Sequence, residues 1–147
     1  MLIVFESRKL PRGGEARAME HESLQNFVRD LDLPSIDTFE NIYADRNYMI
    51  CLEITEFNSI CPKTGLPDFA TLTLEYVPDQ RCAEMKSLKL YITAYRNVGI
   101  FQENATNRIL DDFVKYVQPR SAVLTGRFNA RGGIGTIVRV EYPYPEH

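Results

Sequence analysis

The sequence is poor in the residues that metal sites and disulfide scaffolds need. Its 147 residues include two histidines, His21 and His147, and three cysteines, Cys51, Cys61 and Cys82. The histidines are remote in sequence from the cysteines, and the cysteines lack metal-type spacing, so a zinc site is disfavoured. An odd number of cysteines, in a chain long enough to bury a core, predicts reduced thiols. We therefore expect no metal and no disulfide.

Long apolar runs and an excess of basic residues are missing as well. The apolar run at residues 2–5 is far shorter than a signal peptide requires, and no later stretch approaches a membrane-spanning length. A formal charge of −3 argues against a general nucleic-acid binder, because neutralising phosphates requires a basic face. The expectation is a cytoplasmic protein with neither a membrane nor a direct nucleic-acid partner.

What the sequence does contain is a succession of short periodic segments. Alternating apolar and polar residues predict strands over residues 48–55, 70–76, 122–128 and 134–142. Helical spacing predicts helices over residues 16–31, 88–95 and 103–117, although the second segment also resembles a strand. In the third helix, Asp111, Asp112 and Lys115 are predicted to lie off the apolar face.

The order of these elements from residue 47 to residue 142 is strand, strand, helix, helix, strand, strand. We expect an α+β fold in which a four-stranded antiparallel sheet carries two helices on one face. Such a sheet has two open edges, and pairing them between identical subunits would produce rings. A homo-oligomer is therefore predicted.

The loop that begins at Cys61 is the first candidate for chemistry. It joins the first two strands of the sheet, and Pro62, Gly65 and Pro67 give it the rigidity to hold a thiol near the surface. Cys61 is therefore either a nucleophile or a structural cysteine, as many free thiols are. We interpret Cys51 and Cys82 as structural cysteines. Asp68 lies across the loop as a proton donor, or as a turn cap.

Charged residues later in the chain are candidates for binding. Lys86 and Lys89 are three apart on one side of a predicted helix, where they would grip a phosphate or form a solvated surface pair. Glu103 complements the dipole of the next helix at its start. Arg131, followed by two glycines, is either an exposed turn residue or a phosphate contact.

Several of these segments form longer motifs that occur in one order. They are Cys-Pro-Lys-Thr-Gly-x-Pro-Asp-Phe-Ala-Thr, Glu-x-Lys-Ser-Leu-Lys-Leu-Tyr, Arg-Asn, Phe-x-Glu and Arg-Gly-Gly. Together, from about residue 41 to residue 133, they resemble the single-module NADPH-dependent 7-cyano-7-deazaguanine reductases. The resemblance implies the tunnelling fold, which assembles into rings with active sites between subunits. We therefore expect a catalytic domain at residues 41–147. Residues 1–40 carry no resemblance to the family and form an extension with the helix predicted from its spacing.

The resemblance further implies a reaction in queuosine biosynthesis. Cys61 would add to the nitrile carbon of 7-cyano-7-deazaguanine to form a covalent thioimide, and Asp68 would supply protons. Two NADPH would then reduce the adduct to the aminomethyl product. The residues implied in substrate binding are Ala83, Glu84, Met85, Gln102 and Glu103, and those implied in NADPH binding are Lys86, Lys89 and Arg131. No metal is implied.

Two positions depart from the family pattern. Gln102 stands where the family usually has histidine, and it can donate a hydrogen bond but cannot become a cation near neutral pH. Met85 stands where serine or leucine is commoner, so a hydroxyl contact to the substrate would be missing. These changes predict a slower reaction or an altered pH dependence.

Three alternatives to the reductase remain. An amidinotransferase acting on the cyano-deazaguanine base in tRNA would keep Cys61, Asp68 and Glu103, but the pair Lys86 and Lys89 speaks against it. A non-catalytic deazaguanine-binding protein of the same fold would accommodate the departures at Gln102 and Met85. A pterin-forming cyclohydrolase of this fold ranks last, because the sequence lacks its zinc ligands.

Overall fold

The computed structural model describes residues 27–28 and 30–144. Residues 1–31 and 32–147 form two compact units, and the second unit is described below. The helix predicted over residues 16–31 lies largely outside the described residues, of which Phe27 and Val28 are helical. The predicted domain boundary near residue 40 stays a prediction.

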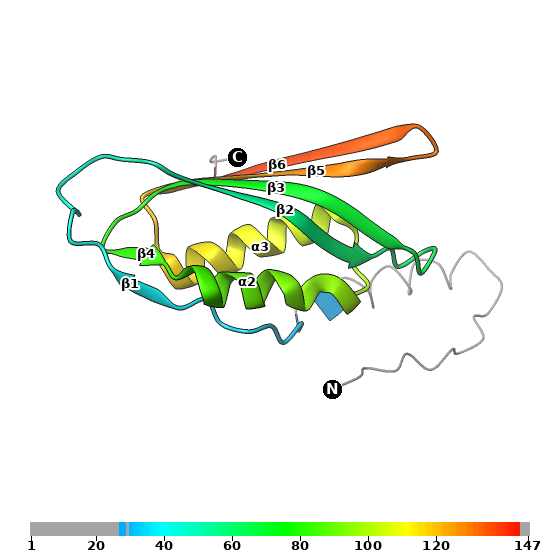
Figure 1. Cartoon of the computed structure of the whole chain (residues 1–147), viewed down its shortest axis with the longest axis horizontal. Helices are drawn as coiled ribbons and strands as arrows, with labels where there is room; N and C mark the ends of the chain where they lie inside the picture. The colour runs from blue at the N-terminus through cyan, green and yellow to red at the C-terminus, as the bar shows by residue number, and fades with distance from the viewer. Residues whose placement is uncertain (1–26, 29, 145–147) are drawn as a thin grey trace. The chain divides into compact units, whose positions relative to one another are not determined.

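One antiparallel sheet and two helices make up most of the second unit. The strands are β2 (Ile50–Ile60), β3 (Pro67–Val77), β5 (Ser121–Arg131) and β6 (Ile134–Tyr142), in the order β2-β3-β5-β6. Helices α2 (Met85–Thr93) and α3 (Gln102–Val117) lie on one face of this sheet, with the 3-10 helix η1 (Ala94–Asn97) between them in sequence (Figure 1). The predicted α+β fold, the element order and the antiparallel sheet are confirmed.

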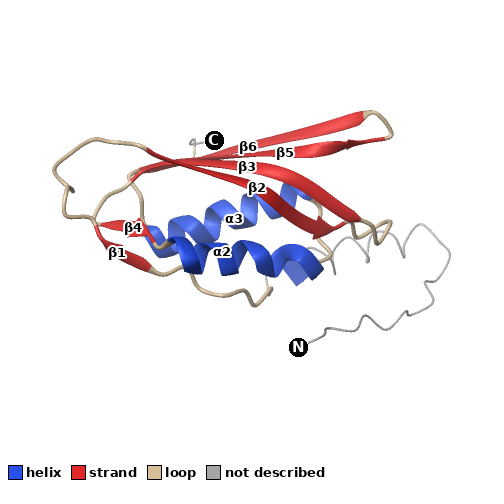
Figure 2. Ribbon diagram, viewed as in Figure 1, coloured by secondary structure: helices blue, strands red, loops and turns tan. Residues whose placement is uncertain are grey.

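The core forms where the alternating face of the sheet meets the helices (Figure 2). Strand β3 buries Ala70, Leu72, Leu74 and Tyr76 in strict alternation. The ring of Tyr76 packs edge-on against that of Phe113 in α3, with 4.9 Å between the ring centroids. The apolar residues of α2 that define its helical period, among them Leu88 and Tyr91, are buried too. The predicted helix, rather than the strand alternative, is therefore confirmed there.

Strand β2 runs five residues further than predicted because its alternation changes phase. The pairing register with β3 shifts between Ile54 and Phe57, which marks a bulge. A bulge inserts an extra residue, so the inward side chains after it are Phe57 and Ser59.

Two short strands that were not predicted, β1 (Thr38–Glu40) and β4 (Arg81–Ala83), pair with each other. Three residues are too few to show a period.

The prediction that Asp112 lies off the apolar face of α3 was wrong, since Asp112 is buried. Its carboxylate accepts hydrogen bonds from the Tyr91 hydroxyl and from Nε of Arg108, both at 2.8 Å. Burial, the neighbouring Tyr95 and the charge of Asp112 raise the pKa of Tyr91 well above its ordinary value. A buried carboxylate is thus matched to donors on α2 and α3, which ties the two helices together.

Close packing of α3 on the sheet depends on a glycine in β5. A Cβ atom at Gly126 would lie 2.9 Å from the ring of Phe128 and 3.0 Å from the hydroxyl of Thr106 in α3. The missing side chain therefore lets the helix approach the strand closely. Neither α2 nor α3, nor any other helix in the described part of the chain, is long and apolar enough to cross a membrane.

Candidate active site

Cys61 is held at the start of a short, closed loop. Strand β2 ends at Ile60, and two backbone hydrogen bonds of 2.8 Å close the loop, from Cys61 N–H to the Leu66 carbonyl and from Gly65 N–H to the Cys61 carbonyl. Gly65 has a φ of +68°, a conformation that a side chain would strain. The loop therefore fixes the backbone of Cys61, and its side chain is half-buried.

The surroundings of the Cys61 thiol favour the thiolate. Burial acts to raise its pKa, as does the charge of Asp68. Hydrogen bonds from the Thr64 hydroxyl and from the backbone N–H groups of Thr64 and Lys63 outweigh these effects, and the pKa lies below its ordinary value. A lowered pKa increases the fraction of cysteine present as thiolate, which is the nucleophilic form.

Asp68 is brought to the same end of the sheet by the pairing of β2 with β3. It lies opposite Ser59 in the register and is 4% exposed. Its Oδ1 atom forms an ion pair with Nε of Arg131 at 2.9 Å and accepts a hydrogen bond from Nε2 of Gln102 at 3.3 Å. Gln102 is the first residue of α3, and Arg131 is the last residue of β5. The structure thus brings Cys61, Asp68, Gln102 and Arg131 to the same end of the sheet.

Three of the other predicted substrate residues lie at the start of α2. Glu84 caps this helix, and its two carboxylate oxygens accept hydrogen bonds from the N–H groups of Lys86 at 2.8 Å and Ser87 at 2.7 Å. These two bonds lower the pKa of Glu84. Ala83 is buried at the end of β4, whereas Met85 is 60% exposed. Glu103 is exposed in the first turn of α3.

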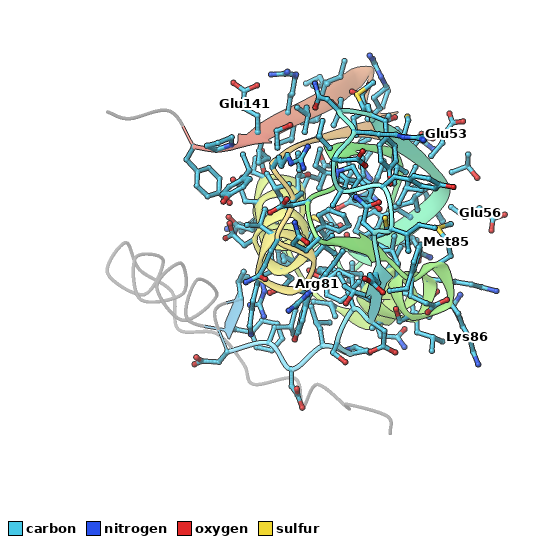
Figure 3. The ribbon with its side chains drawn as sticks, turned by 90° about the vertical axis from the view of Figure 1, so that its left-hand side faces the viewer. Glu53, Glu56, Arg81, Met85, Lys86 and Glu141 are labelled. Atoms are coloured by element: carbon cyan, nitrogen blue, oxygen red, sulfur yellow. The ribbon has the colours of Figure 1, made fainter. Side chains whose placement is uncertain are left out.

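A groove runs between the edge strand β2 and helix α2. Its cationic lining residues are Lys86, Lys89 and Arg96, and its acidic ones are Glu53 and Glu56. Figure 3 shows Glu53 and Glu56 on the same side of the sheet-and-helix unit as Met85 and Lys86. The groove also includes Met85 but neither Cys61 nor Asp68.

One chain does not bring all the predicted site residues together. Helix α2 begins beside β4, at the end of the sheet where β2 starts, whereas Cys61 follows the opposite end of β2 (Figure 1). Lys86 and Lys89 therefore belong to a different region from Cys61. Arg131, predicted to join them in binding NADPH, instead pairs with Asp68.

Two residues with suitable positions were not assigned a role from the sequence. Thr64 donates to the Cys61 thiolate, and Arg96 adds a third cation to the groove. Both lie within the recognised motifs, which is the only sequence feature that could have singled them out. Of the two cysteines interpreted as structural, Cys82 is buried and Cys51 is exposed on β2. Within the described ranges, no group of three or more histidine, cysteine or carboxylate residues could hold a metal.

Comparison with known proteins places the chain in a family. A family model described as QueF-like protein matches residues 67–147. A protein of Chlorobaculum tepidum named NADPH-dependent 7-cyano-7-deazaguanine reductase is 56% identical over 107 residues, which cover 73% of this chain and 92% of the relative. The chain belongs to the QueF-like family. A protein of the same name from Halorhodospira halophila is 56% identical over 108 residues, covering 74% of this chain and 92% of that one.

A solved structure of another QueF-like protein has the same fold. It is an archaeosine synthase in the apo form, and its TM-score to this chain is 0.62 at 20% sequence identity. The similarity covers 67% of this chain and 96% of that one, and at this identity it supports the fold alone. The family expected from the sequence motifs is therefore confirmed, and so is the fold.

Proposed function

We propose that this protein reduces the nitrile of 7-cyano-7-deazaguanine to an aminomethyl group with NADPH, through a thioimide on Cys61. The observation that carries the proposal is the half-buried Cys61 thiol at the start of a closed loop, at the same end of the sheet as the buried Asp68. The names of the reductases that share more than half of their aligned residues with this chain support the same substrate and cofactor.

The first step is the addition of the thiol to the nitrile. The Cys61 sulfur forms a bond to the nitrile carbon, one carbon–nitrogen π bond breaks, and the nitrogen gains the proton that the thiol loses. Asp68 carries this proton, accepting it from sulfur and donating it to nitrogen. The resulting thioimide has a C=N bond that accepts hydride, which the inert nitrile does not.

Two hydride transfers complete the reduction. NADPH supplies each hydride. The first hydride and a proton give an amine-bearing carbon still bound to sulfur, and departure of the Cys61 thiol leaves an imine. A second hydride and proton give the aminomethyl product and restore free Cys61. Two NADPH are consumed for each product.

The groove between β2 and α2 has the chemistry to hold the cofactor. Lys86, Lys89 and Arg96 supply three cations, against the two carboxylates of Glu53 and Glu56. Cations attract the phosphates of a dinucleotide, and an additional one favours NADPH over NADH because of the 2′-phosphate. The start of α2 cannot serve as a second phosphate site without rearrangement, since Glu84 occupies its N–H groups.

The deazaguanine ring would be recognised by acceptors and backbone groups. Glu103 presents an exposed carboxylate that suits the ring N–H and the exocyclic amino group. The carboxylate of Glu84 is committed to capping α2, so residues 83–85 would contribute mainly backbone groups. Gln102 donates to Asp68 and would orient that carboxylate as well as the substrate.

A site formed between subunits explains why these regions lie apart within one chain. Glu84 and Lys86 lie at the start of α2, and Cys61 follows the opposite end of β2. Association of two copies would bring the α2 region of one copy to the Cys61 loop of the other. We therefore include a homo-oligomer in the proposal, with ring assembly through the open edges of the sheet as its form.

The test combines NADPH oxidation with mass spectrometry of the protein after mixing with the nitrile. Wild-type protein should oxidise two NADPH per aminomethyl product and form the thioimide adduct, and Cys61→Ala should do neither. Cys51→Ala is the matched control, because Cys51 is an exposed thiol on β2, the strand that precedes the Cys61 loop. An adduct without NADPH oxidation would favour the amidinotransferase, and no adduct with wild-type protein would favour simple binding.

A further inference from the structure

We propose that Arg131 is a positioning residue for Asp68, so that it acts in the formation of the thioimide before any cofactor is required. This inference rests on the proposed function and extends it. It assigns Arg131 to the covalent step, whereas the sequence motif assigned it to NADPH.

Arg131 holds the beginning of β3 at two points. Its Nε atom lies 2.9 Å from Oδ1 of Asp68, and its terminal nitrogen donates to the carbonyl of Pro67, the residue before Asp68. The Asp68 side chain is 5% exposed and that of Arg131 is 37% exposed. The guanidinium thus reaches from the surface to a buried carboxylate and to its backbone.

The hairpin between β5 and β6 directs Arg131 towards Asp68. Gly132 and Gly133 have φ values of +56° and +80°, as a tight turn between two strands requires. Pairing of β5 with β6 shifts register between Phe128 and Arg131, and bulges of this kind re-aim side chains. Arg131 does not line the groove that contains Lys86 and Lys89. A cofactor role alone does not account for this placement.

The contacts to Asp68 have a consequence for proton transfer. Arg131 forms an ion pair with Oδ1 and Gln102 donates a hydrogen bond to the same oxygen, which leaves Oδ2 as the oxygen to exchange a proton between the Cys61 sulfur and the nitrile nitrogen. Two contacts on one oxygen also restrict rotation of the carboxyl group. Proton transfer requires hydrogen-bond distance in the reacting complex, so a carboxylate free to rotate would transfer protons more slowly.

The experiment measures adduct formation in the absence of NADPH, by rapid mixing of the full chain with 7-cyano-7-deazaguanine and mass analysis over time. At saturating nitrile, Arg131→Ala should form the adduct more slowly than wild type by on the order of 10-fold, with a changed pH profile. Arg131→Lys should recover part of the rate. Arg139→Ala is the matched control, since Arg139 pairs with Glu141 on the exposed face of β6.

The comparison with Lys86→Ala separates the two roles of a cation. In Lys86→Ala, the rate of NADPH oxidation should fall more than the rate of adduct formation. In Arg131→Ala, the rate of adduct formation should fall more. If Arg131→Ala forms the adduct at the wild-type rate and pH profile, the inference is overturned and the proposed function stands. If wild-type protein forms no adduct, the proposed function itself fails. Arg131→Gln, which retains much of the side chain, replaces the alanine variant if the latter does not fold.

Discussion

At the scale of single residues, the three cysteines differ in the surroundings of their thiols. Cys51 is exposed on β2, and Cys82 is buried, 3.8 Å from the hydroxyl of Tyr48. For Cys61, hydrogen bonds from its loop outweigh burial and lower the pKa. Exposure alone would have selected Cys51. The hydrogen-bond donors around the sulfur are therefore the better guide to the nucleophile.

Thr64→Val should reduce the reactivity of Cys61. Removing the hydroxyl removes a hydrogen bond that stabilises the thiolate, so the pKa of Cys61 should rise and the thiolate should form only at higher pH. Alkylation of Cys61 by iodoacetamide at neutral pH should slow several-fold, and its pH profile should move towards alkaline values. Thr64→Ser keeps the hydroxyl and should stay near wild type. Identical pH profiles of alkylation for wild type, Thr64→Val and Thr64→Ser would mean that Thr64 does not affect the pKa of Cys61.

At the scale of helices and strands, charged side chains hold α2 in place. Glu84 closes its first turn, and the Ser87 hydroxyl accepts a hydrogen bond of 2.9 Å from the backbone N–H of Asp37. On the inner side of the helix, Tyr91 donates to Asp112 in α3. Capping and buried pairing thus fix the helix that carries Lys86 and Lys89.

Glu84→Gln should weaken the start of α2 in a pH-dependent way. The folded protein holds Glu84 ionised with a lowered pKa, so its stabilising effect is complete above the ordinary pKa of a glutamate. That effect is lost as the pH falls through the lowered value. At neutral pH the melting temperature of the variant should fall by a few degrees, and the difference should shrink in acid. Thermal unfolding of Glu56→Gln, an exposed residue of β2, provides the baseline.

Asp112→Ala should destabilise the packing between α2 and α3. Tyr91 and Arg108 both donate to this carboxylate, and losing a shared buried acceptor should cost roughly 2–4 kcal/mol. Urea unfolding of the purified variant measures the loss. Asp111→Asn, its exposed neighbour in α3, should change stability by less than about 0.5 kcal/mol. Equal stability of the two variants would show that the buried network contributes little.

At the scale of the whole molecule, the separation of the Cys61 loop from the start of α2 predicts complementation between inactive variants. Cys61→Ala damages one region and Lys86→Ala the other, so a mixed interface would contain one site with both regions intact. Co-expression of the two should recover up to roughly a quarter of wild-type NADPH oxidation, as random mixing of subunits allows. Each variant alone provides the control. If the co-expressed variants oxidise NADPH no faster than the two variants do separately when their rates are added, the site lies within one chain.

Much of the fold was predictable because it depends on local periodicity. The four strands, their order and both helices of the second unit follow from alternating and helical patterns that neighbouring residues impose on each other. The ends of β2 and the strands β1 and β4 were not predictable, because a bulge changes the phase and three-residue strands have no period. Ring assembly and the extension at residues 1–40 stay predictions.

For the candidate site, the sequence by itself determined the family and the closed loop that begins at Cys61, because the loop depends on consecutive residues. Only the tertiary structure decided which charges meet. It paired Arg131 with Asp68 rather than with the groove, and it buried Asp112 between two helices. These pairings join residues far apart in the chain, and a buried charge is tolerated only where the fold supplies its partner. The reactivity proposed for Cys61 therefore begins in its loop and is completed by β3, α3 and the hairpin.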